Sequence, residues 1–386
     1  MAGGFLFNVA LNEAPNIAAH PGFCKRVRFR KSECQRCLEI CPENIISLDP
    51  GPTINSGCTD CGLCQNVCPT EVFQNELHTD QYLLNQAKTF LCRNQHQPSG
   101  EKKRLFVRCH RAENHNKNTL VLPCLGRITT NIFMGAALSG FDEVVLTKGI
   151  CSQCRFQQGE KLLTNSITTS RVLLEATGLG QFAISIEEKE KSKEPMLSRR
   201  EIFSTISNKA KNKAASFLHH REKAIRKKLA GNLQRKRGNR LSPDRELLLK
   251  LLKPKGWENE KVLEYKPEFP WGKIKIEKKN CSGCGTCVAL CPTVAISKKL
   301  KNEQQFLFFN SSLCTNCSLC KEACPQGAID FEENFALSDI LEEEAKVVAK
   351  IKLASCFICG EIIKAGKGKL CPTCEKRQVW PAYVKV

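Results

Sequence analysis

The stretch CSGCGTCVALCP at residues 281–292 is repeated, with the same cysteine spacing, as CTNCSLCKEACP at residues 314–325. Each copy reads C-x2-C-x2-C-x3-C-P. This spacing places three thiolates on one face of a cubane iron-sulfur cluster and sends the fourth to a neighbouring cluster. We therefore predict a unit at residues 273–331 whose fold is organised by two [4Fe-4S] clusters.

A second pair of such runs lies near the N-terminus. The run from Cys58 to Pro69 is complete, whereas the run that ends at Pro42 has Lys31 where its first cysteine should stand. We predict a second unit of the same kind at residues 1–80, with short strands at 45–48 and 53–55 between its cysteine runs.

Both units resemble bacterial-type 2[4Fe-4S] ferredoxins, and the resemblance covers the whole of residues 273–331. It implies crossed ligation, in which the last cysteine of each run serves the other cluster. For residues 273–331 the implied sets are Cys281, Cys284, Cys287 and Cys324, and Cys314, Cys317, Cys320 and Cys291. For residues 1–80 they are Cys58, Cys61, Cys64 and Cys41, and the incomplete Cys34, Cys37 and Cys68.

The incomplete set needs a fourth ligand, and three readings are open. Cys24 lies ten residues before Cys34, in an Arg-rich run similar to the extended starts of some cytoplasmic ferredoxin-like subunits. We predict Cys24 as the ligand of a fourth [4Fe-4S] cluster on this spacing. The alternatives are a [3Fe-4S] cluster with an open corner, and ligation by His20.

Residues 81–188 have a different pattern. Four apolar runs predict buried strands, and two amphipathic patterns between them, at 128–138 and 162–176, predict helices. The expected strands are RLFVRC (104–109), TLVLPC (119–124), EVVLTKG (143–149) and FAISI (182–186). Strands that alternate with helices in this way predict a parallel α/β sheet.

This region contains five cysteines, most of them at the ends of expected strands, where an open parallel sheet places its site. The segments PCLGRI (123–128) and GICSQCRF (149–156) resemble those of the delta subunit of methyl-viologen-reducing hydrogenase, which joins a hydrogenase to heterodisulfide reductase. The resemblance implies a [2Fe-2S] cluster, although the family's first cysteine pair is replaced here by the separated Cys92 and Cys109. We favour Cys109, Cys124, Cys151 and Cys154 as ligands. The alternative is a set of buried structural thiols.

Residues 189–272 are expected to form a basic helical connector. The chain carries a formal net charge of +20, and much of it lies between Lys189 and Arg240. A capping box at Ser198 and an N-cap at Ser242 before Pro243 predict two helices. The connector is interpreted as a solvated surface helix or a docking site for an acidic partner. Nucleic-acid binding is disfavoured because no aromatic platform is interleaved with the charge.

Residues 332–386 are expected to contain a mainly charged helix at 337–352 and then a small cysteine knot. The two knuckles of the knot are Cys356 with Cys359, and Cys371 with Cys374. This arrangement is typical of structural zinc ribbons, which hold one Zn²⁺ in a closed tetrathiolate. The knuckles also resemble those of rubredoxin, so a single redox iron is the alternative.

Composition limits the class of protein. With 386 residues and an odd number of cysteines, 25, the chain does not fit a short secreted disulfide scaffold. It has no basic n-region of a signal peptide and no uninterrupted apolar span. We therefore expect a cytoplasmic protein without a membrane span.

Together these features predict an α+β and α/β multidomain protein that relays electrons between partner oxidoreductases. Hydrogenase, formate dehydrogenase and heterodisulfide-reductase-like enzymes are the expected classes of partner. No catalytic constellation of its own is visible, so we expect an electron-transfer subunit of an oxidoreductase complex, with the anaerobic metabolism that such complexes serve. The rival interpretations are an iron-sulfur scaffold or maturation factor, and a cluster-sensing regulator that binds nucleic acid.

Overall fold

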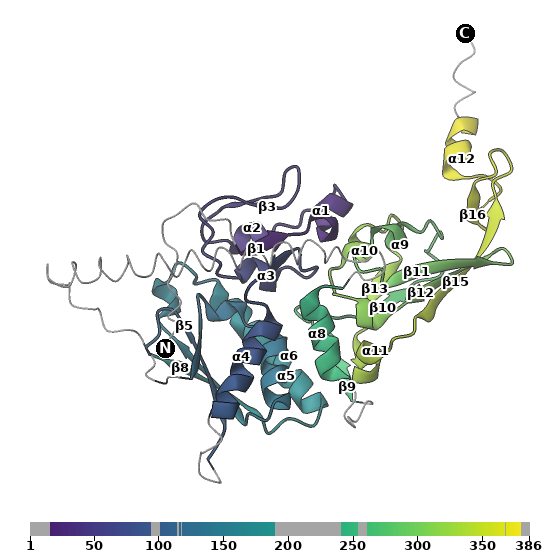
Figure 1. The fold of residues 1–386 in the computed structure, drawn as a ribbon. Helices are drawn as coiled ribbons and strands as arrows, with labels where there is room; N and C mark the ends of the chain where they lie inside the picture. The colour runs from purple at the N-terminus through teal and green to yellow at the C-terminus, as the bar shows by residue number, and fades with distance from the viewer. Residues whose placement is uncertain are drawn as a thin grey trace, which may run out of the picture.

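The computed structural model describes residues 16–93, 101–113, 116, 118–189, 241–253, 261–366 and 368–379. The helix expected to start at Ser198 lies outside these residues. Within the described ranges, no helix combines the length and the apolar character that crossing a bilayer would need. The fold mixes helices and strands in three parts that contact one another (Figure 1).

The first cysteine-rich part is a small α+β unit with two antiparallel strand pairs, β1 with β4 and β2 with β3. The expected short strands at 45–48 and 53–55 are present as β2 and β3. The elements of this unit, in order, are β1 (Ile17–Ala19), η1 (Pro21–Phe23), α1 (Lys25–Arg28), α2 (Arg36–Ile40), β2 (Ile46–Ser47), β3 (Thr53–Ile54), α3 (Leu63–Val67) and β4 (Phe73–Asn75).

The central part is the predicted parallel sheet. Its strand order is β6-β5-β7-β8, all pairs are parallel, and helices α4, α5 and α6 lie along it (Figure 1). Alternate residues of β5, Leu105 and Val107, are buried, because a strand that packs one face on helices alternates its side chains with period two. The elements are α4 (Asp80–Arg93), β5 (Arg104–Cys109), β6 (Thr119–Leu122), η2 (Leu125–Arg127), α5 (Thr130–Leu138), β7 (Glu143–Lys148), η3 (Cys151–Gln153), α6 (Gly159–Ala176) and β8 (Ala183–Glu188).

Helix α8 (Pro243–Leu252) starts where the sequence predicts. The Ser242 side chain accepts a hydrogen bond from the backbone N–H of Arg245, and proline occupies the first turn. Leu247, Leu248 and Leu252 are buried in the core that the central part forms with α4 and α5. The helix therefore packs as part of the central core, between α5 and the second cysteine-rich part (Figure 1).

The second cysteine-rich part contains two antiparallel strand pairs, β10 with β13 and β9 with β14, and a four-stranded sheet of order β11-β12-β15-β16. Its end, with β16 and α12, projects away from the other parts (Figure 1). The elements are β9 (Val262–Glu264), β10 (Ile274–Ile276), α9 (Thr286–Leu290), β11 (Ile296–Lys301), β12 (Gln304–Phe309), η4 (Ser311–Leu313), α10 (Leu319–Glu322), β13 (Ile329–Phe331), β14 (Asn334–Ala336), α11 (Leu337–Leu341), β15 (Lys346–Ser355), β16 (Ile362–Lys364) and α12 (Pro372–Val379).

The helix expected at 337–352 is wrong. Only its first five residues are helical, as α11; residues 342–345 form a connection, and residues 346–352 belong to the ten-residue strand β15. Ala349, Ile351 and Leu353 are buried while Lys350 and Lys352 are exposed, which is a strand alternation of period two. Residues 346–355 form a strand because they pair with β12 of the β11–β12 hairpin. Their buried side chains then pack on the cysteine runs.

Candidate metal centres

Two groups of cysteines surround two separate cavities in the first unit. We name them the Cys24 group (Cys24, Cys34, Cys37 and Cys68) and the Cys41 group (Cys41, Cys58, Cys61 and Cys64); all four members of each group line one cavity. Neither Lys31 nor His20 lines the cavity of the Cys24 group. The sets are those that crossed ligation implies for this unit, with Cys24 in the fourth place.

Short helices carry cysteines of one group toward the other. Helix α2 contains Cys37 and is C-capped by Cys41, and helix α3 contains Cys64 and is C-capped by Cys68. Four residues of helix advance by about 6 Å, so each helix spans the gap between the two cavities. Proline at 42 and 69 then prevents the helix from continuing.

The second unit repeats this arrangement. All four members of the Cys281 group (Cys281, Cys284, Cys287 and Cys324) line one cavity, and Cys291 does not line it. Cys291 instead lies near enough to Cys314, Cys317 and Cys320 to raise the pKa of each of those thiols. We call these four residues the Cys291 group.

Burial disfavours ionisation of several thiols in these groups. Burial, followed by neighbouring thiols of the same group, raises the pKa of Cys37 and of Cys287 to about 12. Burial likewise raises the pKa of Cys314 to about 12. Such thiols ionise only where a nearby cation compensates their charge. Thiolate sulfur is a soft ligand, so iron in a cluster fits this donor set. Binding of the metal would then release the thiol protons.

Backbone N–H groups are also aimed at the sulfur atoms. The N–H of Val72 donates to Sγ of Cys68 at 3.4 Å, and the N–H of Ala328 donates to Sγ of Cys324 at 3.3 Å. The N–H of Asn316 donates to Sγ of Cys314 at 3.4 Å. Such bonds stabilise a thiolate and tune a metal that it holds.

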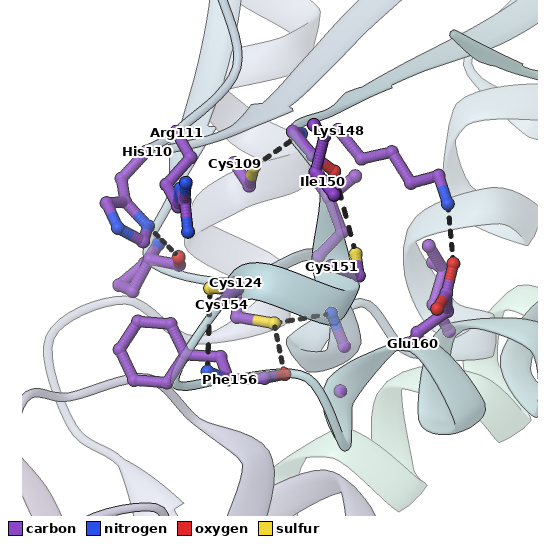
Figure 2. A pocket seen from close by; sticks show the side chains of 16 residues that line it. Cys109, His110, Arg111, Cys124, Lys148, Ile150, Cys151, Cys154, Phe156 and Glu160 are labelled. Carbon is purple, nitrogen blue, oxygen red and sulfur yellow. Dashed lines mark hydrogen bonds and ion pairs between the residues drawn. The ribbon is translucent and has the colours of Figure 1, made fainter. Parts of the chain in front are cut away.

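A further cavity lies at the carboxyl ends of the parallel strands and is lined by Cys109, Cys124, Cys151 and Cys154, the Cys109 group (Figure 2). Cys109 ends β5, and Cys151 and Cys154 belong to and cap η3 after β7. The fifth cysteine of the region, Cys92, is exposed on α4 and does not line this cavity. Burial raises the pKa of Cys124 to about 12, as in the other groups.

Gly159 brings α6 close to this cavity. A Cβ atom at this position would lie 2.5 Å from Sγ of Cys124 and 3.1 Å from Cδ2 of Leu63. Cys124 therefore occupies the space between the start of α6 and the first unit, and any side chain at 159 would displace it.

We expect Gly159→Ala to lower the unfolding free energy by about 1–3 kcal/mol, the usual cost of overpacking. It should also lower the metal content of the Cys109 group, since Sγ of Cys124 has to move. Gly180→Ala is the control, because its Cβ would have no neighbour closer than 3.8 Å. Denaturant unfolding and metal analysis of both variants test this; equal stability would contradict the close approach.

Two residues at the same cavity were not identified from the sequence. His110 hydrogen-bonds through Nδ1 to the carbonyl oxygen of Pro123 at 2.6 Å and packs edge-on against Phe156 (Figure 2). Arg111 donates from Nη1 to the carbonyl oxygen of Gln153 at 2.6 Å. Both residues directly follow Cys109 at the end of β5, and this position in the sequence could have indicated that they lie at the cavity.

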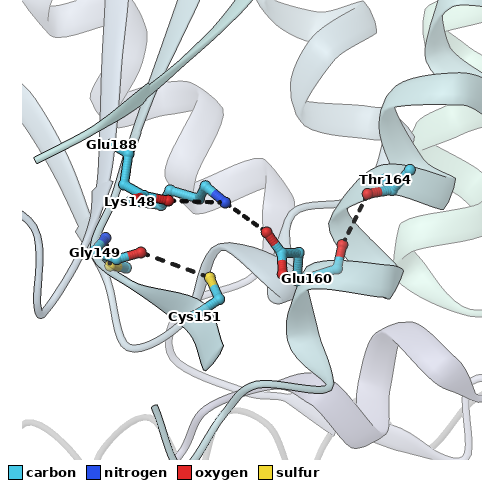
Figure 3. A network of polar contacts seen from close by, with 7 residues as sticks. Lys148, Gly149, Cys151, Glu160, Thr164 and Glu188 are labelled. Carbon is cyan, nitrogen blue, oxygen red and sulfur yellow. Dashed lines mark hydrogen bonds and ion pairs between the residues drawn. The ribbon is translucent and has the colours of Figure 1, made fainter. Parts of the chain in front are cut away.

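An ion-pair network borders the cavity on the α6 side (Figure 3). Lys148, at the end of β7, pairs with Glu160 and also with Glu188 at 3.3 Å. Burial, and then the Glu160 carboxylate, raise the pKa of Cys151, and Lys148 opposes this. The network ties the strand that leads to Cys151 to the first turn of α6.

The last four cysteines form a compact set, the Cys356 group. The sulfur atoms of Cys356, Cys359, Cys371 and Cys374 all lie within 4.8 Å of one another. The N–H of Cys371 donates to Sγ of Cys356 at 3.2 Å. Hydrogen bonds from backbone N–H groups, first that of Cys359, lower the pKa of Cys356 to about 6. A closed tetrathiolate is suited to a single metal ion.

Comparison with known proteins agrees with the cysteine geometry of the two small units. Models of the 4Fe-4S dicluster domain match residues 32–72 and residues 280–329. The chain contains two 4Fe-4S dicluster ferredoxin domains. These domains imply [4Fe-4S] clusters and support an electron-transfer role.

Two relatives share parts of the chain. The polyferredoxin protein MvhB of Methanothermus fervidus is 34% identical over 93 residues, which are 24% of this chain and 20% of that protein. An uncharacterized ferredoxin of Methanocaldococcus jannaschii is 29% identical over 56 residues, which are 14% of this chain and 73% of that protein. The match with the polyferredoxin thus spans only a fifth of that relative's length.

Buried cations lie beside both dicluster domains. Arg245 of α8 is 2% exposed and donates to the carbonyl oxygens of Ser312, Pro270 and Cys314 at 3.0 to 3.2 Å. Arg127 is 3% exposed and packs on Gly62, next to Cys61. A positive charge at these positions would stabilise the more negative, reduced state of a cluster held nearby.

Arg127 has acidic neighbours on its other side. Burial lowers its pKa, while Asp80 favours its charged form. Asp80 accepts hydrogen bonds from Thr129 and Asn131, and Asn131 also donates to the carbonyl oxygen of Asp244 at 2.9 Å. Gln65 of the first dicluster domain donates to the Asp244 carboxylate at 2.6 Å, so this polar network joins that domain, the central sheet part and α8.

Proposed function

We propose that the protein is an iron-sulfur electron-transfer subunit with five clusters and one structural metal. The Cys24, Cys41, Cys281 and Cys291 groups would each hold a [4Fe-4S] cluster. The Cys109 group would hold a [2Fe-2S] cluster, and the Cys356 group a Zn²⁺ ion. When bound, the clusters supply one-electron carriers to partner proteins.

One observation carries this proposal: six groups of four cysteines account for every cysteine of the chain except Cys92. A set of structural core thiols would have no reason to divide in this way. Apart from the exposed Cys284, the cysteines of five groups are buried or half-buried, which favours electron carriers largely shielded from water. For the Cys109 group, the resemblance to the hydrogenase delta subunit supports the smaller cluster.

The chain's own residues would set the potentials. Backbone N–H groups donate to the sulfur atoms, and Arg127 and Arg245 place positive charge beside the Cys41 and Cys291 groups. Both kinds of contact favour the reduced state, in which the cluster carries more negative charge. At the Cys356 group the short segment between the two knuckles favours zinc over a rubredoxin-type iron.

The partners in this proposal are oxidoreductases that donate or accept single electrons. The name of the polyferredoxin relative is consistent with such a role. Hydrogenase, formate dehydrogenase and heterodisulfide-reductase-like enzymes are the classes that the resemblance of the central part suggests. Copurification under anaerobic conditions identifies which of them is served.

Metal analysis tests the cluster inventory. We expect about 18 iron atoms per chain, four in each cubane and two in the Cys109 group, with about one zinc. Cys154→Ser should remove about two irons and a [2Fe-2S] EPR signal while the cubane signals remain. Eight irons or fewer in the anaerobically isolated protein would contradict the five-cluster inventory.

The same preparation separates a carrier from a scaffold. A carrier keeps its iron through gel filtration in the presence of a chelator, because its thiolates hold clusters that are not handed on. Iron that passes quantitatively to an apo-ferredoxin under these conditions would favour the scaffold interpretation instead.

A further inference from the structure

The five proposed clusters raise a question that their ligands alone do not answer: in which order does an electron meet them? Three contacts between groups, and two contacts between the dicluster domains, bear on this order.

The Cys109 group meets the first domain at the Cys41 group. Cys124 and Cys154 pack in the same apolar cluster as Cys61, Cys64 and Leu63. Leu63 and Cys124 both lie against Gly159, where a Cβ atom would be 3.1 Å from Cδ2 of Leu63. Asn66 of α3 donates to the carbonyl oxygen of Gly126 at 2.7 Å. The Cys41 group is therefore the neighbour of the central part.

Within each dicluster domain, short helices join the two groups. Helices α2 and α3 link the Cys41 group to the Cys24 group, and α9, which contains Cys287, is C-capped by Cys291. The Cys24 group therefore lies one helix turn from the Cys41 group. In the second domain, the Cys291 group lies one helix turn from the Cys281 group.

The two domains meet through α1. Arg28 donates from Nε to the carbonyl oxygen of Leu290 at 2.6 Å, and from Nη2 to those of Ala289 at 2.9 Å and Cys291 at 3.3 Å. Arg28 thus binds the carboxyl end of α9, including the backbone of Cys291, a member of the Cys291 group. On its own side it donates from Nη1 to the carbonyl oxygen of Gly22 at 3.2 Å.

Lys25 makes the second contact of α1. It follows Cys24, lines the cavity of the Cys24 group, and forms an ion pair with Glu322 at 2.7 Å. Glu322 lies in α10, between Cys320 of the Cys291 group and Cys324 of the Cys281 group. The side chains of Lys25 and Glu322 are 13% and 31% exposed, so bulk water screens the pair only in part.

We propose that the groups form one unbranched electron path in the order Cys109, Cys41, Cys24, Cys291 and Cys281, and that α1 is the crossing between the two dicluster domains. The inference rests on the proposed function, because it needs a redox cluster in each group. Arg28 and Lys25 act as positioning residues that hold the Cys24 and Cys291 groups next to each other. The electron leaves one reduced cluster and is taken up by the next, without bond making. Cys284 is exposed, so the Cys281 end of the path is open to a partner.

Photoreduction from one end tests the order. A ruthenium photoreductant is attached to Lys189→Cys in a Cys92→Ser background, since Lys189 is exposed and its backbone N–H donates to the carbonyl oxygen of Lys148, which lines the cavity of the Cys109 group. Electrons then enter near the Cys109 group, and freeze-quench EPR follows their arrival in the second dicluster domain. Iron content and the cluster signals of the same sample report separately on the proposed function: their absence in the unmodified protein would refute that function, whatever the order.

Arg28→Gln should slow arrival in the second domain by about tenfold, because loss of charge-assisted hydrogen bonds lowers the population of the docked arrangement by about that factor. Arg30→Gln is the matched control: it removes the same charge from an exposed residue two positions away. Reduction of the first domain should be unchanged in both variants.

A charge swap gives a second measurement that does not depend on Arg28. Lys25→Glu and Glu322→Lys should each slow the crossing, and the double variant should restore it because the ion pair forms again. Equal rates in Arg28→Gln and Arg30→Gln, with no effect of the swap, would overturn the proposal. So would a crossing that survives Arg28→Gln but falls in Arg245→Met, since that result would place it at α8.

Discussion

Replacing Cys291 by serine should remove the cluster of the Cys291 group and leave that of the Cys281 group. Cys291 follows Cys287 on α9, yet only Cys287 lines the cavity of the Cys281 group. The expected loss is about four irons, because a cubane with three thiolates and a buried hydroxyl is incompletely held. Cys324→Ser should have the opposite effect and remove the cluster of the Cys281 group.

The measurement is iron content with EPR of the reduced protein. Reference spectra come from Cys281→Ser/Cys284→Ser and Cys314→Ser/Cys317→Ser, in which the remaining signal identifies each cluster. Cys92→Ser should lose no iron, since this exposed cysteine lies outside all six groups. Loss of the Cys281 cluster in the Cys291→Ser protein would refute crossed ligation in this domain.

Arg245→Met should lower the unfolding free energy by about 3 kcal/mol or more, because three carbonyl groups lose their donor in a buried site. Methionine keeps much of the side-chain volume, so the effect reports on hydrogen bonding more than on packing. The second dicluster domain should unfold first, since the carbonyl oxygens of Ser312 and Cys314 lie at the start of one of its cysteine runs.

Thermal or denaturant unfolding of the metal-loaded protein measures this effect. Lys250→Met is the control on the same helix; Lys250 is exposed, and such surface changes usually stay within about 0.5 kcal/mol. Arg245→Lys should recover only part of the stability, because one ammonium group cannot reach the positions that the guanidinium fork covers. An Arg245→Met protein as stable as Lys250→Met would contradict this account of α8.

Local spacing made much of this molecule predictable. The cysteine runs indicated two 4Fe-4S dicluster domains, and the apolar runs at 104–109 and 143–149 indicated the parallel sheet, because both signals depend on residues close in sequence. The helix expected at 337–352 failed because β15 is fixed by pairing with β12, about forty residues earlier in the chain. The strand ends and the family resemblance favoured the four cysteines of the Cys109 group, and the fold adds that they line one cavity.

The contacts between the parts were not predictable. Arg28 and Arg245 bind backbone carbonyl oxygens, and a carbonyl is present at every residue, so it leaves no mark in the sequence. From composition alone, Arg28 is one of several cations in an Arg-rich run. Only the fold shows that this one reaches α9 of the other dicluster domain.

That mode of contact has a consequence for how such chains can change over time. An interface built from guanidinium groups on carbonyl oxygens places no demand on the side chains at 289 or 290, only on the path of the main chain there. Substitutions at these positions can accumulate without weakening the hydrogen bonds between the two dicluster domains. A different ferredoxin-type module with the same backbone turns could be recombined into this place and still be held by Arg28 and Arg245.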